Sequence, residues 1–368
     1  MRAILLLAVL TAIAPFGLKA QWTIQTPTTA DLRGIDNVGK GVAWASGTNG
    51  TVLRTEDAGY LWQTCTIPPG AEHLDFRGIQ AFDANTAIVM SSGTGDQSRL
   101  YKTTDGCQTW TLLFTNPDKD GFWDAIKFQD KNFGVLLGDP VGRKFFARQM
   151  ADGGRTWRLL GDDKALATVD PNAGIFAASN SSVALRPNRP PFSKCNYSQL
   201  WFGTGGSQGP KVFRFDLDFH PACSDVGIYR WMSANVPMAG SNASSGIFSL
   251  GAEDDYRLVA VGGDYLKPDD RKGTAAFSED GGKTWQAATT PPHGFRSAVA
   301  YDAPTKTWIT VGPNGTDIST DDGRNWRALH PAANEAPDAD QHWNALSLPY
   351  VVGPHGRIGI LNPSALKP

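Results

Sequence analysis

The sequence has little of the chemistry that marks metal, redox or nucleic-acid sites. Its six histidines are scattered, without an HxH or HExxH pair, and its four cysteines show no CxxC spacing. We therefore expect no metal site and no cofactor. Only 19% of the residues are charged and the net charge is −2, which leaves no basic stripe for a phosphate backbone. Nucleic acid is not an expected partner.

Long apolar runs are absent beyond the first 20 residues. Arg2, the apolar run 3–18 and Ala20 before Gln21 have the layout of a secretory signal peptide. We expect residues 1–20 to be removed and the protein to be secreted or periplasmic. No later segment approaches the roughly 20 apolar residues of a membrane-spanning helix. No linker divides residues 21–368, so we expect one domain and a monomer.

What the sequence does contain is a repeat that ends in tryptophan. SEDGGKTW at 278–285 recurs as TEDAGYLW, TTDGCQTW, MADGGRTW and STDDGRNW, and a degenerate copy follows Asp225. An active site occurs once per domain, so a segment present five times is structural. The aspartate is expected to accept hydrogen bonds from N–H groups two residues on, while the tryptophan fills space between sheets. These aspartate turns are assigned to Asp57 and Trp62, Asp105 and Trp110, Asp152 and Trp157, Asp280 and Trp285, and Asp321 and Trp326.

A second repeat consists of apolar runs that each end in glycine. Such runs, bounded by glycine turns, are typical of strands buried on both faces. Their spacing of 41 to 65 residues is close to that of four-stranded propeller blades. The glycines are Gly47, Gly93, Gly138, Gly203, Gly262, Gly312 and Gly353.

Together the two repeats predict an all-β fold, a seven-bladed β-propeller of four-stranded antiparallel blades. The last unit lacks a fourth strand, which a strand at 21–27 is expected to supply, so that the ring closes and no sheet edge is left exposed. The predicted blades span about 32–66, 74–115, 122–161, 174–236, 245–290, 294–330 and 342–361 plus 21–27.

The aspartate turns resemble the Asp-box or BNR repeats of sialidases and sortilin-like propellers. Units such as 32–62 are more similar to the photosystem II stability and assembly factor family, over nearly the whole chain after residue 20. This resemblance implies an exported, non-catalytic propeller that binds a protein partner. The chain departs from that family in two respects: the aspartate turn of the fourth unit is degenerate, and there is no lipid-anchor cysteine.

In a propeller the site-forming positions begin the first strand of each blade or follow the second, at the mouth of a central funnel. Arg33, Arg77 and Arg296 lie at equivalent positions and are suited to hold a carboxylate or phosphate, in a protein partner or an anionic small ligand. Alternatively they pair with nearby aspartates and join the blades. The expected ligand-binding residues are Arg33, Arg77, Trp123, Asp124, Asn180, Tyr265, Arg296, Trp343 and Asn344.

An alternative function is that of a sialidase-like glycoside hydrolase. Such an enzyme needs two funnel carboxyl groups, for which Asp124, Asp139 and Asp264 are the candidates. The sequence has no RIP motif and no assignable tyrosine nucleophile with a glutamate partner. We therefore place binding before catalysis and assign no catalytic residue.

Of the four cysteines, we predict that two form a disulfide and leave the pairing of the other two open. Cys195 and Cys223 lie in two long loops expected at the same end of the fourth blade, and we predict a disulfide between them. Cys65 and Cys107 lie in neighbouring units but are expected at different heights, so their pairing stays open.

Overall fold

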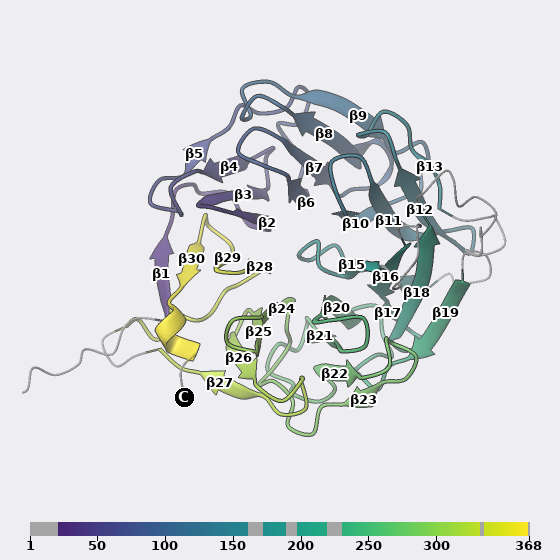
Figure 1. Cartoon of the computed structure of the whole chain (residues 1–368), viewed down its shortest axis with the longest axis vertical. Helices are drawn as coiled ribbons and strands as arrows, with labels where there is room; N and C mark the ends of the chain where they lie inside the picture. The colour runs from purple at the N-terminus through teal and green to yellow at the C-terminus, as the bar shows by residue number, and fades with distance from the viewer. Residues whose placement is uncertain (1–20, 161–171, 189–196, 219–229, 332–334, 367–368) are drawn as a thin grey trace, which may run out of the picture.

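The computed structural model describes residues 21–160, 172–188, 197–218, 230–331 and 335–366. Over these residues seven antiparallel sheets stand around a central axis, as Figure 1 shows. The predicted all-β, seven-bladed propeller is confirmed. No helix in the described part of the chain is long and apolar enough to cross a membrane. The predicted signal peptide and the predicted Cys195–Cys223 pair lie outside the described residues.

Each of the first three blades is a four-stranded meander that runs from the central axis outward. A short 3₁₀ turn, η1 (Gly95–Gln97), precedes the third strand of blade 2. The strands are β2 (Leu32–Gly39), β3 (Val42–Gly47), β4 (Val52–Thr55) and β5 (Gln63–Thr64) in blade 1, β6 (Phe76–Ala81), β7 (Ala87–Ser91), β8 (Arg99–Thr103) and β9 (Thr111–Thr115) in blade 2, and β10 (Trp123–Phe128), β11 (Gly134–Val141), β12 (Lys144–Met150) and β13 (Arg158–Leu159) in blade 3.

Blades 4 to 6 follow the same plan with one addition. Two short strands, β14 (Ala173–Gly174) and β17 (Gly205–Gly206), extend the inner edge of blade 5, so its sheet has six strands where four were predicted. The other strands are β15 (Val183–Asn188), β16 (Tyr197–Gly203), β18 (Lys211–Asp218) and β19 (Arg230–Asn235) in blade 4, β20 (Ser245–Ala252), β21 (Leu258–Asp264), β22 (Ala275–Ser278) and β23 (Gln286–Ala287) in blade 5, and β24 (Ala298–Asp302), β25 (Thr307–Gly312), β26 (Gly315–Ser319) and β27 (Arg327–Leu329) in blade 6.

Blade 7 joins the two ends of the chain. It contains β28 (Ala345–Ser347), β29 (Tyr350–Val352) and β30 (Ile358–Leu361), and β1 (Trp22–Gln25) pairs antiparallel with β30 as its outermost strand. Figure 1 shows β1 beside β30, with the 3₁₀ turn η3 (Pro363–Leu366) following. The first strand of the described chain therefore closes the ring, which agrees with the sequence prediction.

The hydrophobic core is divided among the blade interfaces. Seven clusters of buried side chains form among the described residues, and each joins two neighbouring blades. Trp44, Trp201 and Trp308, all from second strands, are fully buried in these clusters. Because the apolar second strands contact both neighbours, they read as continuous apolar runs in the sequence.

The recurring glycine of the second strand marks a close approach between two backbones. A Cβ at Gly47 would lie 2.3 Å from the carbonyl oxygen of Asp31, and one at Gly138 would lie 2.3 Å from that of Phe122. The next N–H in each case donates to the same carbonyl, as from Asp139 to Phe122 at 3.0 Å. Only glycine permits this contact, which fixes the residue after it at the mouth of the funnel.

In all five aspartate turns the aspartate accepts a hydrogen bond from the N–H four residues on, and in four of them it also accepts from the Ser or Thr hydroxyl that begins the turn, where blade 3 has Met150. In the copy at 278–285, the Ser278 hydroxyl donates to Asp280 (2.9 Å) and accepts from the Gly282 N–H (2.9 Å), while Asp280 accepts from the Thr284 N–H (2.9 Å). The aspartate thus caps the N–H four residues on, where the sequence analysis expected two. The N–H of Gly281 bonds to the carbonyl of Tyr256, so the turn packs on the first hairpin of its own blade.

Cys65 and Cys107 form a disulfide, with 5.3 Å between their Cα atoms. The expectation that they lie at different heights is wrong. Cys107 occupies the fifth position of its aspartate turn with φ of 65°, where Gly282 stands in the turn of blade 5. Cys65 follows the last strand of blade 1 and meets it there, so the bond joins blades 1 and 2.

Candidate functional site

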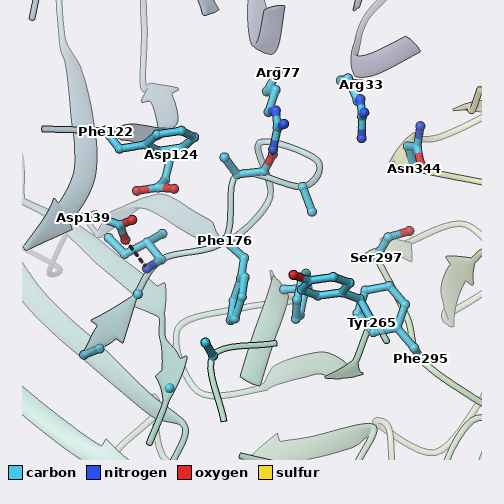
Figure 2. Close-up of a pocket in the computed structure, with 18 of the residues that line it drawn as sticks. Arg33, Arg77, Phe122, Asp124, Asp139, Phe176, Tyr265, Phe295, Ser297 and Asn344 are labelled. Carbon is cyan, nitrogen blue, oxygen red and sulfur yellow. Dashed lines mark hydrogen bonds between the residues drawn. The ribbon is translucent and has the colours of Figure 1, made fainter. Parts of the chain in front are cut away.

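A cavity of about 860 Å³ lies at the funnel mouth, on the side where first strands begin and second strands end. Figure 2 shows Arg33 and Arg77 pointing into it from one side, Asp124 and Asp139 facing it from another, and Tyr265 and Phe295 opposite the acids. No residue of an aspartate turn belongs to its lining. The aspartate turns therefore take no part in forming the cavity.

Four lining side chains are placed by the same backbone irregularity. In blades 1, 2, 3 and 5 the pairing of the first two strands shifts register within the first strand, at its second residue in blades 1 to 3 and at its fourth in blade 5, which is the signature of a β-bulge. A bulge turns a side chain out of the regular alternation, and bulges are common next to binding sites. The residues at the shifts are Arg33, Arg77, Asp124 and Phe248, and all four line the cavity.

Arg33 and Arg77 share one carboxylate. Arg77 Nε donates to Asp75 Oδ2 at 2.8 Å, and Arg33 Nε lies 4.0 Å from Asp75 Oδ1. Arg77 Nη1 also donates to the carbonyl of Ala177 (3.4 Å). Both arginine side chains remain 31% exposed, and Arg33 makes no other ion pair or hydrogen bond within the described chain. Two guanidinium groups beside one carboxylate leave a net positive charge facing the cavity.

Asp124 and Asp139 form an acidic wall. Burial raises the pKa of Asp124 well above its usual value, and repulsion from Asp139 raises it further, while Arg77 and the Asp139 backbone N–H act in the opposite direction. Burial also raises the pKa of Asp139 to about 6, against a hydrogen bond of 2.9 Å from the Ile175 N–H. Asp139 is therefore mostly ionised at neutral pH, and Asp124 keeps its proton to a higher pH than an ordinary carboxyl group.

Aromatic rings form the third side of the cavity. Phe176 stacks on Phe248 with 3.8 Å between ring centroids, and Phe295 meets Phe248 edge-on at 4.7 Å. Tyr265 completes the group and is 49% exposed at the rim. These rings offer apolar contact area to a ligand beside the charged groups.

Three of the expected ligand-binding residues make structural contacts and do not line the cavity. Arg296 is fully buried, donates from Nε to Asp317 (2.8 Å) and from Nη1 to Asn314 (2.6 Å), and does not line the cavity. Trp123 is also fully buried and stacks on Phe114. Asn180 accepts from the Ile126 N–H (2.8 Å) and donates to the Ile79 carbonyl (3.3 Å), so it ties the segment below the cavity to blades 2 and 3.

Trp343 and Asn344 do reach the cavity, together with Arg33, Arg77, Asp124 and Tyr265. Asn344 donates to the carbonyl of Leu32 (2.8 Å), and the Trp343 ring lies beneath Arg357 with only an edge in the lining. The third carboxyl candidate, Asp264, is outside the lining. The Ser244 hydroxyl donates to it at 2.6 Å and holds its pKa below the usual value.

Sequence reasoning missed several residues that line the cavity or contact its lining. Asp75, which sets the spacing of the two arginines, precedes a first strand and follows no repeat. Phe176 and Ile175 belong to the segment between blades 3 and 4, whose irregular length hides its path. Phe295 carries no motif either. Phe248 was not missed: it stands at the same bulge position as Arg33, Arg77 and Asp124, in the part of the first strand that the sequence places at the funnel mouth.

In the part of the chain that the structure describes, no group of three or more histidine, cysteine or acidic residues is placed so that it could hold a metal ion. Asp124 and Asp139 interact in the acidic wall, and Asp120 is a third carboxyl residue among the described residues that line the cavity.

Comparison with known proteins places the fold. Neither the family models nor the curated proteins that were searched match the chain. Among solved structures it is similar to YCF48 bound to D1 peptide, with 18% identity and a TM-score of 0.59 over 93% of this chain and 96% of that one. It is also similar to YCF48 from Cyanidioschyzon merolae, with 18% identity and a TM-score of 0.60 over 94% of this chain and 100% of that one. The WD40 β-propeller domain of Doa1 has 9% identity and a TM-score of 0.57 over 94% of this chain and 97% of that one. The chain thus has the propeller fold that the photosystem II assembly factor YCF48 has, as the resemblance implied.

Proposed function

We propose that this protein is an exported, non-catalytic, assembly-factor-like binding protein that recognises a carboxylate-bearing segment of another protein at the funnel. The observation that carries the proposal is the pair of bulge residues, Arg33 and Arg77, which share the single carboxylate of Asp75 and keep exposed guanidinium groups in a cavity of peptide size. A guanidinium fork is well matched to a carboxylate.

The rings beside the arginines favour a protein segment over a small anion. Phe176, Phe248, Phe295 and Tyr265 provide a wall for apolar side chains, which a phosphate or acetate would leave unused. YCF48, which shares the fold, has been solved with a peptide bound. We take this as support for a peptide ligand here, whose sequence is open.

Selection from a random hexapeptide library would test the proposal. Wild-type protein is expected to enrich peptides that combine Asp or Glu with an apolar residue, and Arg33→Gln/Arg77→Gln is expected to lose that enrichment. Replacing the selected acid by its amide should weaken binding about tenfold in calorimetry, more at low ionic strength. Arg327→Gln, on the exposed outer strand β27, is the matched control. The proposal would be overturned if no peptides were enriched, or if the double variant enriched the same peptides as wild type. Binding of acetate or phosphate without any peptide would favour a small anion.

Glycoside hydrolysis is the second candidate, because burial raises the pKa values of both Asp124 and Asp139, and a raised carboxyl pKa is what the general acid of such an enzyme needs. Asp124 is only 1% exposed, which weighs against contact with a glycosidic oxygen, because that atom is flanked by two bulky sugar rings. A screen of glycoside substrates with wild-type protein and Asp124→Asn decides it. Turnover that disappears in Asp124→Asn would place catalysis ahead of binding.

A further inference from the structure

The acidic wall contains a polar atom that nothing in the described structure satisfies. Asp124 is 1% exposed, and its Oδ2 has no hydrogen-bond partner, although the residue lines the cavity. Buried polar atoms are almost always paired, and leaving one unpaired is unfavourable. An unpaired carboxyl oxygen at a cavity wall therefore points to a missing donor.

The neighbouring cation does not fill this role. Arg77 influences the pKa of Asp124, but its hydrogen bonds go to Asp75 and to the carbonyl of Ala177. Asp139, at the end of the adjacent strand, receives one N–H, from Ile175. Figure 2 shows the two carboxyl groups next to each other, across the cavity from Tyr265 and Phe295.

We propose that Asp124 and Asp139 form a subsite for an ammonium group of the bound segment, either a lysine side chain or an N-terminal amine. An ammonium has three donors, enough for Asp124 Oδ2 and an oxygen of Asp139. Phe122 and Phe176 line the same corner and suit the aliphatic stem or the charge itself. The inference rests on the proposed function and adds a second charge requirement: the ligand carries an acid for the arginines and an amine for the aspartates.

Ammonium binding should release protons. A cation beside the pair favours the charged forms and lowers both raised pKa values, so affinity should increase as the pH rises through about 6. The other charged groups around the pair are Arg77 of β6, Asp75 before it, Arg33 of β2 and Asp120 before β10.

The test uses Nα-acetyl-lysine amide, which has an ammonium but no carboxylate, and its norleucine isostere as the neutral control. Binding is followed by calorimetry and by the NMR shift of the Ile175 N–H, which reports on Asp139. We expect the lysine amide to bind and the norleucine amide not to bind. The affinity of the lysine amide should be at least about tenfold lower for Asp124→Asn than for wild type, and lower near pH 5 than near pH 8. Asp130→Asn, in the first turn of blade 3 and away from the cavity, is the control. Phenylalanine amide tests for an N-terminal amine.

Equal binding of lysine and norleucine amides together with no binding of phenylalanine amide, or an unchanged affinity in both Asp124→Asn and Asp139→Asn, would overturn the subsite. Ca²⁺ or Mg²⁺ alone moving the Ile175 signal, with no response to the amines, would replace it by a metal site. The lysine amide should still bind to Arg33→Gln/Arg77→Gln. If only the selection for acidic peptides fails, the proposed function is contradicted and the amine subsite is not. If only the amine fails to bind, the subsite is contradicted and the selection for acidic peptides is unaffected.

Discussion

At the scale of single residues, the site depends on which charges the fold leaves without a partner. Arg77 is the second residue of β6 and Arg296 lies just before β24, but Arg296 is fully buried on Asp317 whereas Arg77 remains partly open to the cavity. Removing one partner of the buried Arg296 pair would destabilise the fold, and removing Arg77 would mainly affect binding. The same residue type thus has a structural role in one blade and, in the function we propose, a recognition role in another.

Asp139 should make stability depend on pH. Its pKa is raised to about 6 in the folded protein, above the unfolded value, so the contribution of its neutral form to stability is lost as the pH rises from about 4 to 6. Asp139→Asn never becomes charged and keeps an oxygen for the Ile175 N–H. We expect it to raise the free energy of unfolding by up to about 3 kcal/mol near pH 8 and to change little near pH 4.

Urea unfolding at the two pH values would measure this difference. Asp264→Asn is the contrasting variant, because the pKa of Asp264 is lowered by Ser244 and its charged form stabilises the fold. That variant should lose stability at the higher pH. If Asp139→Asn is no more stable than wild type near pH 8, the raised pKa of Asp139 is contradicted.

At the scale of elements, the aspartate turn is a local structure that carries its own hydrogen-bond partners. For this reason its position, and the strands on either side of it, could be predicted from the sequence. The Cys65–Cys107 bond could not, because it depends on how two neighbouring blades are aligned. The bulges were also hidden, since a register shift between paired strands leaves no mark in one sequence, although Arg33 and Arg77 stood in the right places.

Gly282→Ala tests the turn. Gly282 has φ of 83°, and an added Cβ would lie 3.2 Å from the Trp201 ring. We expect a loss of about 1–3 kcal/mol in unfolding free energy, measured by urea denaturation. Gly142→Ala, at φ of 57° with no atom within 4 Å of its Cβ, isolates the backbone part of the cost. A smaller loss at Gly282 than at Gly142 would contradict the packing assigned to this turn.

At the scale of the whole molecule, ring closure joins segments more than 300 residues apart. Trp22 of β1 is buried at 2% exposure and lies 5.7 Å from the Trp343 ring. The unfinished last repeat and the unpaired strand before the first were sufficient to predict this closure. The cavity was only partly predictable, because Phe176 and its segment enter it from an irregular connection between blades.

A variant lacking residues 1–27 should leave β30 as an open edge. We expect a lower melting temperature and concentration-dependent association, since unpaired strand edges attract other chains. A synthetic peptide of residues 21–29 should restore the melting temperature, and the same peptide with Trp22→Ala should restore less of it. Unchanged melting and a monomeric state without these residues would show that closure by β1 is dispensable.

The central claim is that the funnel, and not the face with the aspartate turns, holds a carboxylate of a protein segment. The most direct measurement is a crystal structure of the protein with a selected glutamate-containing peptide. We predict the glutamate carboxylate within about 2.7–3.2 Å of guanidinium nitrogens of Arg33 and Arg77. A peptide seated on the opposite face, with both arginines untouched, would contradict the account.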